Sequence, residues 1–199
     1  MRLKPLLVVL ALCLLVSAPT FAQNLVSNGS FETGDFTSWG TTGNFEFSTV
    51  TSGAFYVYTG AEDGNFYGTF GPVGSLGGIT QSLTTTAGTG YNFSFWLNAV
   101  GDDPSAFQAL WDGSPVLAMS DPTTGGVWTQ YSFHETGTGH DTIEFDFQDD
   151  PAYIALDNVV VSSSATSTST GTTPEPSSFI LLGTGVLALG GFVRRKFRA

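Results

Sequence analysis

Short runs in which apolar and polar residues alternate fill the middle of the chain. In residues 91–98 the apolar side chains alternate with polar ones, and residues 143–148 repeat the pattern. A period of two places one set on the buried face of a strand and the other on the outer face. The predicted strands are Asn44–Val50, Asn65–Phe70, Gly78–Thr84, Tyr91–Asn98, Phe107–Trp111, Val116–Met119, Trp128–Glu135, Thr142–Phe147 and Tyr153–Val161.

Turn-forming Gly, Asp, Pro and Ser residues separate these runs, and none of the runs has a helical period. Many short strands between turn signals are typical of an antiparallel sandwich or barrel. Residues 23–161 are enough for one domain with a proper hydrophobic core. The pattern therefore predicts an all-β fold, with a single antiparallel β-sandwich over residues 23–161.

The first 22 residues have the layout of a secretory signal peptide. Arg2 and Lys4 precede the apolar run 6–16, and the small residues Thr20 and Ala22 stand where a signal peptidase reads them. Cys13, the one cysteine of the chain, falls within this segment. The mature chain is therefore expected to be exported, and to hold no disulfide and no zinc–thiolate site.

The other end of the chain is predicted to cross a membrane. Residues 177–193 are uncharged and mostly apolar, which is long enough for one transmembrane helix. Arg194 and Arg195 open a basic cluster directly behind this span, and such a cluster stays on the cytoplasmic side. Residues 162–173, rich in Ser and Thr, are predicted to be a flexible linker.

A short proline-rich motif precedes the predicted span. Pro174, Glu175 and Pro176 come just before it, and the arginine-rich end follows it. In this order the three parts, over residues 174–199, resemble the PEP-CTERM sorting signal of Gram-negative bacteria. The resemblance implies that an exosortase-type transpeptidase processes the chain near this motif. The protein would be anchored in the membrane until then, and would afterwards reach the cell surface or the extracellular matrix.

Charge is distributed very unevenly along the chain. All six Lys and Arg lie in the two terminal segments, whereas the predicted domain holds every acidic residue except Glu175, 16 of the 17. Nucleic acid is excluded as a partner, because its binding draws on Lys and Arg contacts to phosphate. Unbalanced acid repels itself in a compact domain. Divalent cations such as Ca²⁺, which take carboxylate and carbonyl oxygens, are the obvious compensation.

Three segments resemble the galactose-binding-like jelly rolls that include calcium-containing carbohydrate-binding modules. They are the opening Leu25–Glu32 (LVSNGSFE), the central Trp128–Phe133 (WTQYSF) and the closing Leu156–Val159 (LDNV). The resemblance spans nearly the whole domain and implies a jelly-roll sandwich. It also implies that a structural Ca²⁺ joins the first and last strands.

On that resemblance Glu32 and Asp157 match the side-chain ligands of the calcium ion. Asn28 and the turn around Asp63 are placed to add further oxygen atoms. A physical argument stands beside it: acids near both ends of a lysine-free domain must repel, stay apart or share a cation. The alternative is that Glu32 and Asp157 are merely solvated.

Aromatic side chains are the remaining candidates for chemistry, because sugar rings stack on them while amides and carboxylates bind the hydroxyls. Trp96 is the leading candidate, since alternation places it on the polar face of its strand. The alternative is that Trp96 packs under a loop. Trp111 and the pair Tyr56 and Tyr58 are weaker candidates. The partners predicted for Trp96 are Asn92 and Asn98 on its own strand, with Gln130 and Glu144 on adjacent strands.

Enzymatic chemistry finds little support in the sequence. Sixteen acids supply carboxylate pairs by chance, and none lies in a motif that fixes a glycosidase partner. His134 and His140 lack a convincing third zinc ligand, and no Gly-x-Ser-x-Gly motif occurs. The leading hypothesis is therefore a non-enzymatic, exported module that binds polysaccharide. The alternatives are a structural surface or biofilm protein with no dedicated ligand and, less favoured, a small hydrolase.

Overall fold

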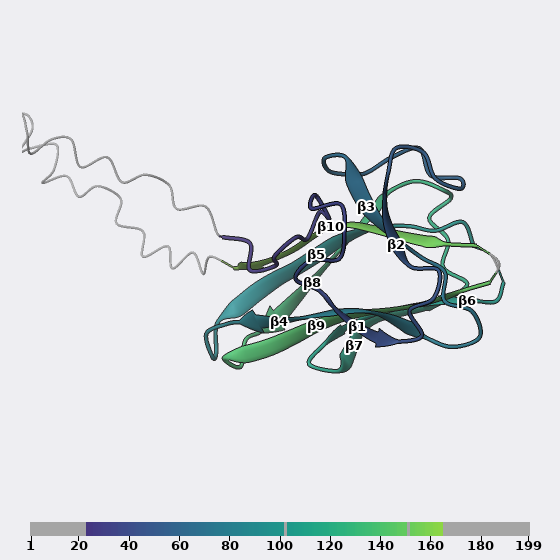
Figure 1. Ribbon diagram of the computed structural model, residues 1–199. Helices are drawn as coiled ribbons and strands as arrows, with labels where there is room; N and C mark the ends of the chain where they lie inside the picture. Colours follow the sequence, from purple (N-terminus) through teal and green to yellow (C-terminus); the bar gives the residue numbers. More distant parts are fainter. Residues whose placement is uncertain (1–22, 102, 151, 165–199) are drawn as a thin grey trace, which may run out of the picture. The chain divides into compact units, whose positions relative to one another are not determined.

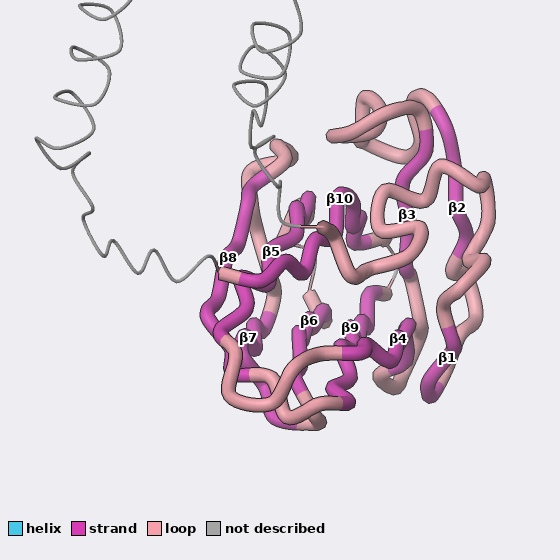
Figure 2. Tube along the Cα trace, turned by 90° about the vertical axis from the view of Figure 1, so that its left-hand side faces the viewer, coloured by secondary structure: helices cyan, strands magenta, loops and turns pink. Residues whose placement is uncertain are grey.

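The computed structural model describes residues 23–101, 103–150 and 152–164, and in this part of the chain every regular element is a strand (Figures 1 and 2). Two antiparallel sheets face each other. The first has the strand order β1-β4-β9-β6-β7, and the second the order β2-β3-β10-β5-β8. The strands are β1 (Gly40–Gly43), β2 (Thr49–Ser52), β3 (Phe66–Phe70), β4 (Gly77–Thr84), β5 (Gly90–Asn98), β6 (Ser105–Trp111), β7 (Ser114–Ser120), β8 (Thr129–Thr136), β9 (His140–Asp149) and β10 (Ile154–Ser163).

The predicted all-β sandwich is confirmed, and eight of the nine predicted strands correspond to β3–β10. The predicted strand Asn44–Val50 is wrong. Here the chain leaves the first sheet after β1 and enters the second at β2. Phe47 has a φ of 56°, which belongs to a turn and not to a strand. β10 also continues through Ser163, two residues beyond the predicted end of the domain.

The space between the sheets is filled mainly by aromatic rings. Phe93 and Phe95 of β5 point into it, as do Phe145 and Phe147 of β9, and all four side chains are fully buried. Phe70 stacks on Phe147 with ring centroids 4.0 Å apart. Offset and edge-to-face rings add to the free energy gained by burying apolar surface. The period-two pattern of the sequence thus corresponds directly to this core.

The N-terminal segment is held against the last strand. Leu25 donates its backbone N–H to the carbonyl of Val161 at 2.8 Å, and Val159 donates to the carbonyl of Gly29 at 2.9 Å. Gly29 is required here, because a Cβ atom would lie 2.1 Å from the Val159 carbonyl oxygen. Both ends of the described domain therefore lie at the same end of the sandwich, where β10 finishes (Figure 1).

Several predicted segments lie outside the described residues. These are the signal peptide 1–22, most of the linker, the span 177–193 and the sorting residues Pro174–Pro176, Arg194 and Arg195. In the ranges that the structure does describe, no helix has the length and apolar character to cross a membrane.

Candidate functional site

The outer face of the second sheet carries the predicted tryptophan. Trp96 of β5 is half-buried and is paired in register with Gln130 of β8 on one side and with Asp157 of β10 on the other. Asn92 lies further along the same face of β5, exposed, and opposite His134. The structure thus brings Trp96, Gln130 and Asn92 to one face, as alternation along the two strands predicts.

Two of the predicted partners of Trp96 are placed differently. Glu144 belongs to β9 in the other sheet, between Thr80 and Leu110, so the prediction that it shares this face is wrong. Alternation indicates which side of a strand a residue takes, but not which sheet the strand joins. Burial raises the pKa of Glu144, and the nearby Asp146 carboxylate raises it further.

Asn98 lies on the expected side of β5 but is only 3% exposed. Its amide donates to the carbonyl of Gly126 at 3.3 Å, and the Thr124 hydroxyl donates to its oxygen at 3.4 Å. Asn98 therefore holds the loop before β8, and its side chain does not face solvent beside Trp96.

The connection between β2 and β3 covers part of this same face. Tyr58 and Tyr67 form a second, smaller buried cluster there with Ala155, and Trp128 packs against it. The indole N–H of Trp128 donates to the carbonyl of Gly60 at 3.0 Å. Tyr58, one of the weaker ligand candidates, is thus a buried packing residue. Farther along this face, on β5 and β8, Asn92, Gln130 and His134 are exposed and Trp96 is half-buried.

Asp157, a predicted metal ligand, is a fully buried carboxylate. Its Oδ2 accepts the backbone N–H groups of Glu62 at 2.7 Å and Asp63 at 2.9 Å, and its Oδ1 accepts that of Asn158 at 2.7 Å. Burial raises its pKa to about 7, although these hydrogen bonds act in the opposite direction. Asp157 therefore fixes the turn ahead of β3 to the middle of β10.

Glu32, the second predicted ligand, binds the other end of that turn. Its Oε1 accepts the backbone N–H groups of Asn65 and Phe66, both at 2.8 Å. The hydrogen bonds from Phe66 and Asn65 hold the pKa of the Glu32 carboxyl below its usual value. Gly64 allows this close approach, because a Cβ atom there would lie 2.4 Å from the carboxylate.

The other two predicted ligands are bound more locally. Asp63 accepts a hydrogen bond from the Ser30 hydroxyl at 2.8 Å, which joins the turn to the opening segment. The amide of Asn28 donates to the carbonyls of Asp35 and Thr37, both at 3.0 Å. The Asn28 side chain is thus used within its own loop.

Glu32, Asp63 and Asp157 all belong to or bind one turn, and their hard oxygen atoms suit Ca²⁺. Over the described ranges, no group of three or more His, Cys, Asp or Glu side chains has the spacing to hold a metal ion. A calcium ion at this turn would therefore need backbone carbonyl oxygens besides the carboxylates. The residues fit the ion by the chemistry of their donors.

A pocket of about 220 Å³ opens at the opposite end of β10. Three connections meet around it: β1–β2, β3–β4 and β9–β10. Phe47, Val73 and Tyr153 supply apolar surface, and the lining also includes two acidic residues, the buried Asp149 and the half-buried Asp150. We call this feature the loop-end pocket. It combines the aromatic and acidic groups that bind polar ligands with apolar faces.

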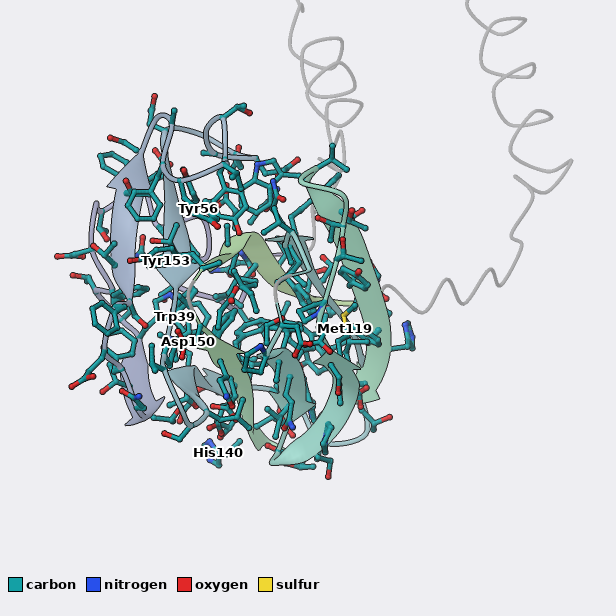
Figure 3. The ribbon with its side chains drawn as sticks, turned by 90° about the vertical axis from the view of Figure 1, so that its right-hand side faces the viewer. Trp39, Tyr56, Met119, His140, Asp150 and Tyr153 are labelled. Atoms are coloured by element: carbon teal, nitrogen blue, oxygen red, sulfur yellow. The ribbon has the colours of Figure 1, made fainter. Side chains whose placement is uncertain are left out.

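Exposed aromatic surface continues beyond the loop-end pocket. The Phe47 side chain is 60% exposed and that of Tyr56 is 54% exposed, unusually high values for such large rings. The ring of Tyr56 lies 6.0 Å from that of Tyr153, and the ring of Phe55 lies 5.0 Å from it. Figure 3, a view of this end of the domain, shows Tyr153 between Tyr56 and Asp150.

The loop-end pocket is not among the sites predicted from the sequence. Phe47 and Tyr153 fall within predicted strands, and Tyr56, whose ring lies 6.0 Å from that of Tyr153, is one of the weaker candidates. The turn residues of the β3–β4 and β9–β10 connections predict loops there, but they do not predict that the loops meet.

A family model for the PEP-CTERM protein-sorting motif matches residues 172–196. This confirms the sorting signal predicted for the end of the chain and implies an exported protein. No curated protein is similar enough to the chain to count as a match.

Solved structures that are similar to the chain share its fold. One is TmCBM61 in complex with β-1,4-galactotriose, with 18% identity over 72% of this chain and 100% of that chain, at a TM-score of 0.58. Another is the CBM22-1 xylan-binding domain from Paenibacillus barcinonensis Xyn10C, with 19% identity over 73% and 97% and a TM-score of 0.53.

A cyclase from Fischerella sp. TAU has 14% identity over 72% of this chain and 98% of that chain, at a TM-score of 0.54. The same sandwich therefore occurs in binding modules and in an enzyme, and function must be argued from the site. The chain joins a jelly-roll domain, of the fold found in carbohydrate-binding modules, to a PEP-CTERM sorting motif.

Proposed function

We propose that this protein is exported, is processed by an exosortase at its PEP-CTERM motif, and binds polysaccharide at the cell surface or in the extracellular matrix. The observation that carries the binding proposal is the loop-end pocket. An exposed ring from Phe47 and a ring from Tyr153 border a space of about 220 Å³, which has room for one sugar ring, and the half-buried acid Asp150 belongs to the same lining. Aromatic faces stack on sugars while carboxylates accept hydrogen bonds from their hydroxyls.

The open part of the outer sheet face, around Trp96, is proposed as a second contact surface for the chain of the polysaccharide. Gln130 and Asn92 offer amide groups on the same face. Sugar units that continue from the loop-end pocket would meet the β2–β3 connection before they reach Trp96. The two surfaces are therefore tested separately.

Calcium is proposed as a structural ion at the turn 62–66, held by Glu32 and Asp157 with carbonyl oxygens of the turn. It would offset part of the charge of 16 acids in a domain without Lys or Arg. The protein is proposed to be non-enzymatic. The carboxylates of Glu32, Asp63 and Asp157 accept hydrogen bonds that hold the turn 62–66 in place.

A glycan array tests the proposed function. The full-length protein is applied in a detergent that has no sugar headgroup, with calcium and with a chelator. We expect retention on a restricted set of polysaccharides, and loss of retention for Phe47→Ala. Binding to no glycan would favour the alternative of a structural surface protein without a dedicated ligand. Release of shortened glycans from the array would favour the hydrolase.

A further inference from the structure

We propose that the loop-end pocket selects a sugar that carries a free ammonium group, so that its preferred polymers contain deacetylated amino sugars. This inference rests on the proposed polysaccharide binding and names the class of sugar. Two features support the selection of an ammonium group: the groups that line the pocket and the charges that the domain lacks. A third, the direction in which the pocket faces, concerns its access to a polymer.

The lining of the pocket suits a cation. Asp149 ends β9 and lines the pocket, but its side chain is only 3% exposed and offers little surface to a ligand. Asp150 follows it and is half-buried, so its carboxylate is the accessible one. An ammonium group beside the Asp150 carboxylate would form charge-assisted hydrogen bonds, which are roughly twice as strong as neutral ones.

Aromatic rings also belong to the lining. Phe47 and Tyr153 line the pocket, and the ring of Tyr56 lies 6.0 Å from that of Tyr153. A cation within about 6 Å of a ring centroid is attracted to the face of the ring, and aromatic cages for ammonium groups use this attraction. The same rings stack on the apolar face of a sugar, so one amino sugar satisfies both parts of the lining.

The domain has no Lys or Arg side chain to offer an acidic sugar. Residues 23–193 contain neither residue type. A uronic acid or a sulfated sugar in this pocket would bring its negative charge next to Asp149 and Asp150 with no Lys or Arg to balance it, which costs free energy. A neutral sugar would neither be repelled by the acidic residues of the pocket nor form an ion pair with them. Of the three kinds of sugar, only one with an ammonium group is attracted by both the acidic and the aromatic residues of the lining.

The pocket faces away from the chain ends. Tyr153 lies just before β10, and β10 runs from Ile154 to Ser163, where the chain leaves the domain. The opening segment is paired with that same far end through Leu25 and Val161 (Figure 1). A protein held by its C-terminal motif would thus present the pocket at the opposite end of the sandwich.

Two hexasaccharides of β-1,4-linked glucosamine, one fully deacetylated and one fully N-acetylated, test this inference. They differ in whether each nitrogen is a charged ammonium group or carries an uncharged acetyl group. Calorimetry with the full-length protein in a sugar-free detergent, at pH 6 and 150 mM salt, gives the affinity for each. We expect the deacetylated form to bind at least tenfold more tightly.

An acidic domain attracts any polycation, so tighter binding of the deacetylated form does not by itself show that the pocket binds it. The test therefore compares two variants that each lose one negative charge. Asp150→Asn is expected to weaken binding of the deacetylated form at least fivefold. Glu135→Gln, which removes one charge on β8, is the matched control and is expected to change it less than twofold. Equal losses in the two variants would mean non-specific attraction and would overturn the inference. Displacement by polylysine that also depends on Asp150 would do so too, since the ligand would then be a basic polypeptide.

The two proposals fail differently. Equal affinity for both hexasaccharides, abolished by Phe47→Ala, would overturn the ammonium selectivity and leave polysaccharide binding in place. Binding of neither hexasaccharide, together with a blank glycan array, would remove the proposed function itself. Tyr153→Phe, which keeps the ring, is a second variant that should fold and retain the selectivity.

Discussion

Glu32 and Asp157, which lie near opposite ends of the domain sequence, bind opposite ends of one turn. Asp157 accepts the N–H groups of Glu62 and Asp63, and Glu32 accepts those of Asn65 and Phe66. The opening segment, the turn ahead of β3 and the last strand are thus joined by two carboxylates. No Lys or Arg of the domain balances them.

Chelation is expected to destabilise the protein if calcium completes this junction. An ion present at 100 times its dissociation constant adds about 2.7 kcal/mol to the free energy of unfolding. For a domain of this size that corresponds to a fall in Tm of about 5–10 °C on chelation. Differential scanning calorimetry with and without EGTA measures the change. Asp157→Asn should abolish the chelator effect, whereas Glu144→Gln, on the other sheet, should retain it. An unchanged Tm in the wild-type protein would remove calcium from the proposal.

A separate buried acid predicts how stability changes at low pH. Burial acts to raise the pKa of Asp141, but hydrogen bonds from Thr85, Thr138 and the neighbouring carboxyl of Asp112 outweigh it and bring the pKa to about 2. The unfolded value is about 3.9. The folded state therefore favours the charged form, and this contribution is complete above about pH 4 and is lost as the pH falls through 2.

Asp141→Asn is accordingly expected to cost about 2 kcal/mol at pH 7 and much less near pH 2. Urea unfolding at a series of pH values gives the two stability curves. Their separation should narrow only below pH 4. A separation that stays constant down to pH 2 would mean that Asp141 contributes through its shape and not through its charge.

The contact of the opening segment with β10 predicts that Gly29 cannot be replaced without a loss of stability. A Cβ atom at Gly29 would lie 2.1 Å from the carbonyl oxygen of Val159, so Gly29→Ala must displace one of two paired segments. We expect a loss of more than about 2 kcal/mol, in the range of strain and broken hydrogen bonds. Gly40→Ala is the control, because its Cβ would meet no atom closer than the Thr80 methyl group at 3.3 Å, with the Thr80 backbone oxygen at 3.7 Å. Equal losses in urea unfolding would contradict this account.

How much could be predicted from the sequence differs between the fold and the site. Alternation predicted the strands and the inward side chains, because one buried face imposes the same period on every strand. It could not assign β9 to a sheet, so Glu144 was placed beside Trp96 although it lies in the opposite sheet. The loop-end pocket depends on Phe47, Val73 and Tyr153 coming together from three connections. The order of the strands in the two sheets brings these residues together, and that order cannot be predicted from the local sequence.

Variants that each remove one aromatic ring test which surface binds the polysaccharide. Phe47→Ala is expected to lower the affinity by about 1–2 kcal/mol, roughly 5–30-fold, because it removes an exposed ring at a pocket without touching the core. Trp96→Ala should have a smaller effect if the outer sheet face only extends the contact. Calorimetry with the best ligand from the array measures both. A large loss for Trp96→Ala with none for Phe47→Ala would move the site to the sheet face.

The sorting motif leads to a prediction about the cleavage of the protein and its release from the membrane. If an exosortase processes the chain near Pro174–Pro176, the protein recovered from the host's surface or medium should lack the residues beyond that motif. Pro174→Ala combined with Pro176→Ala should leave the full mass and keep the protein with the membrane fraction. Ser167→Ala, in the linker, should behave as the wild type. Intact mass spectrometry of both fractions distinguishes the outcomes. A wild-type protein that retains residues 177–199 when it is recovered from the surface or medium would rule out cleavage at this motif.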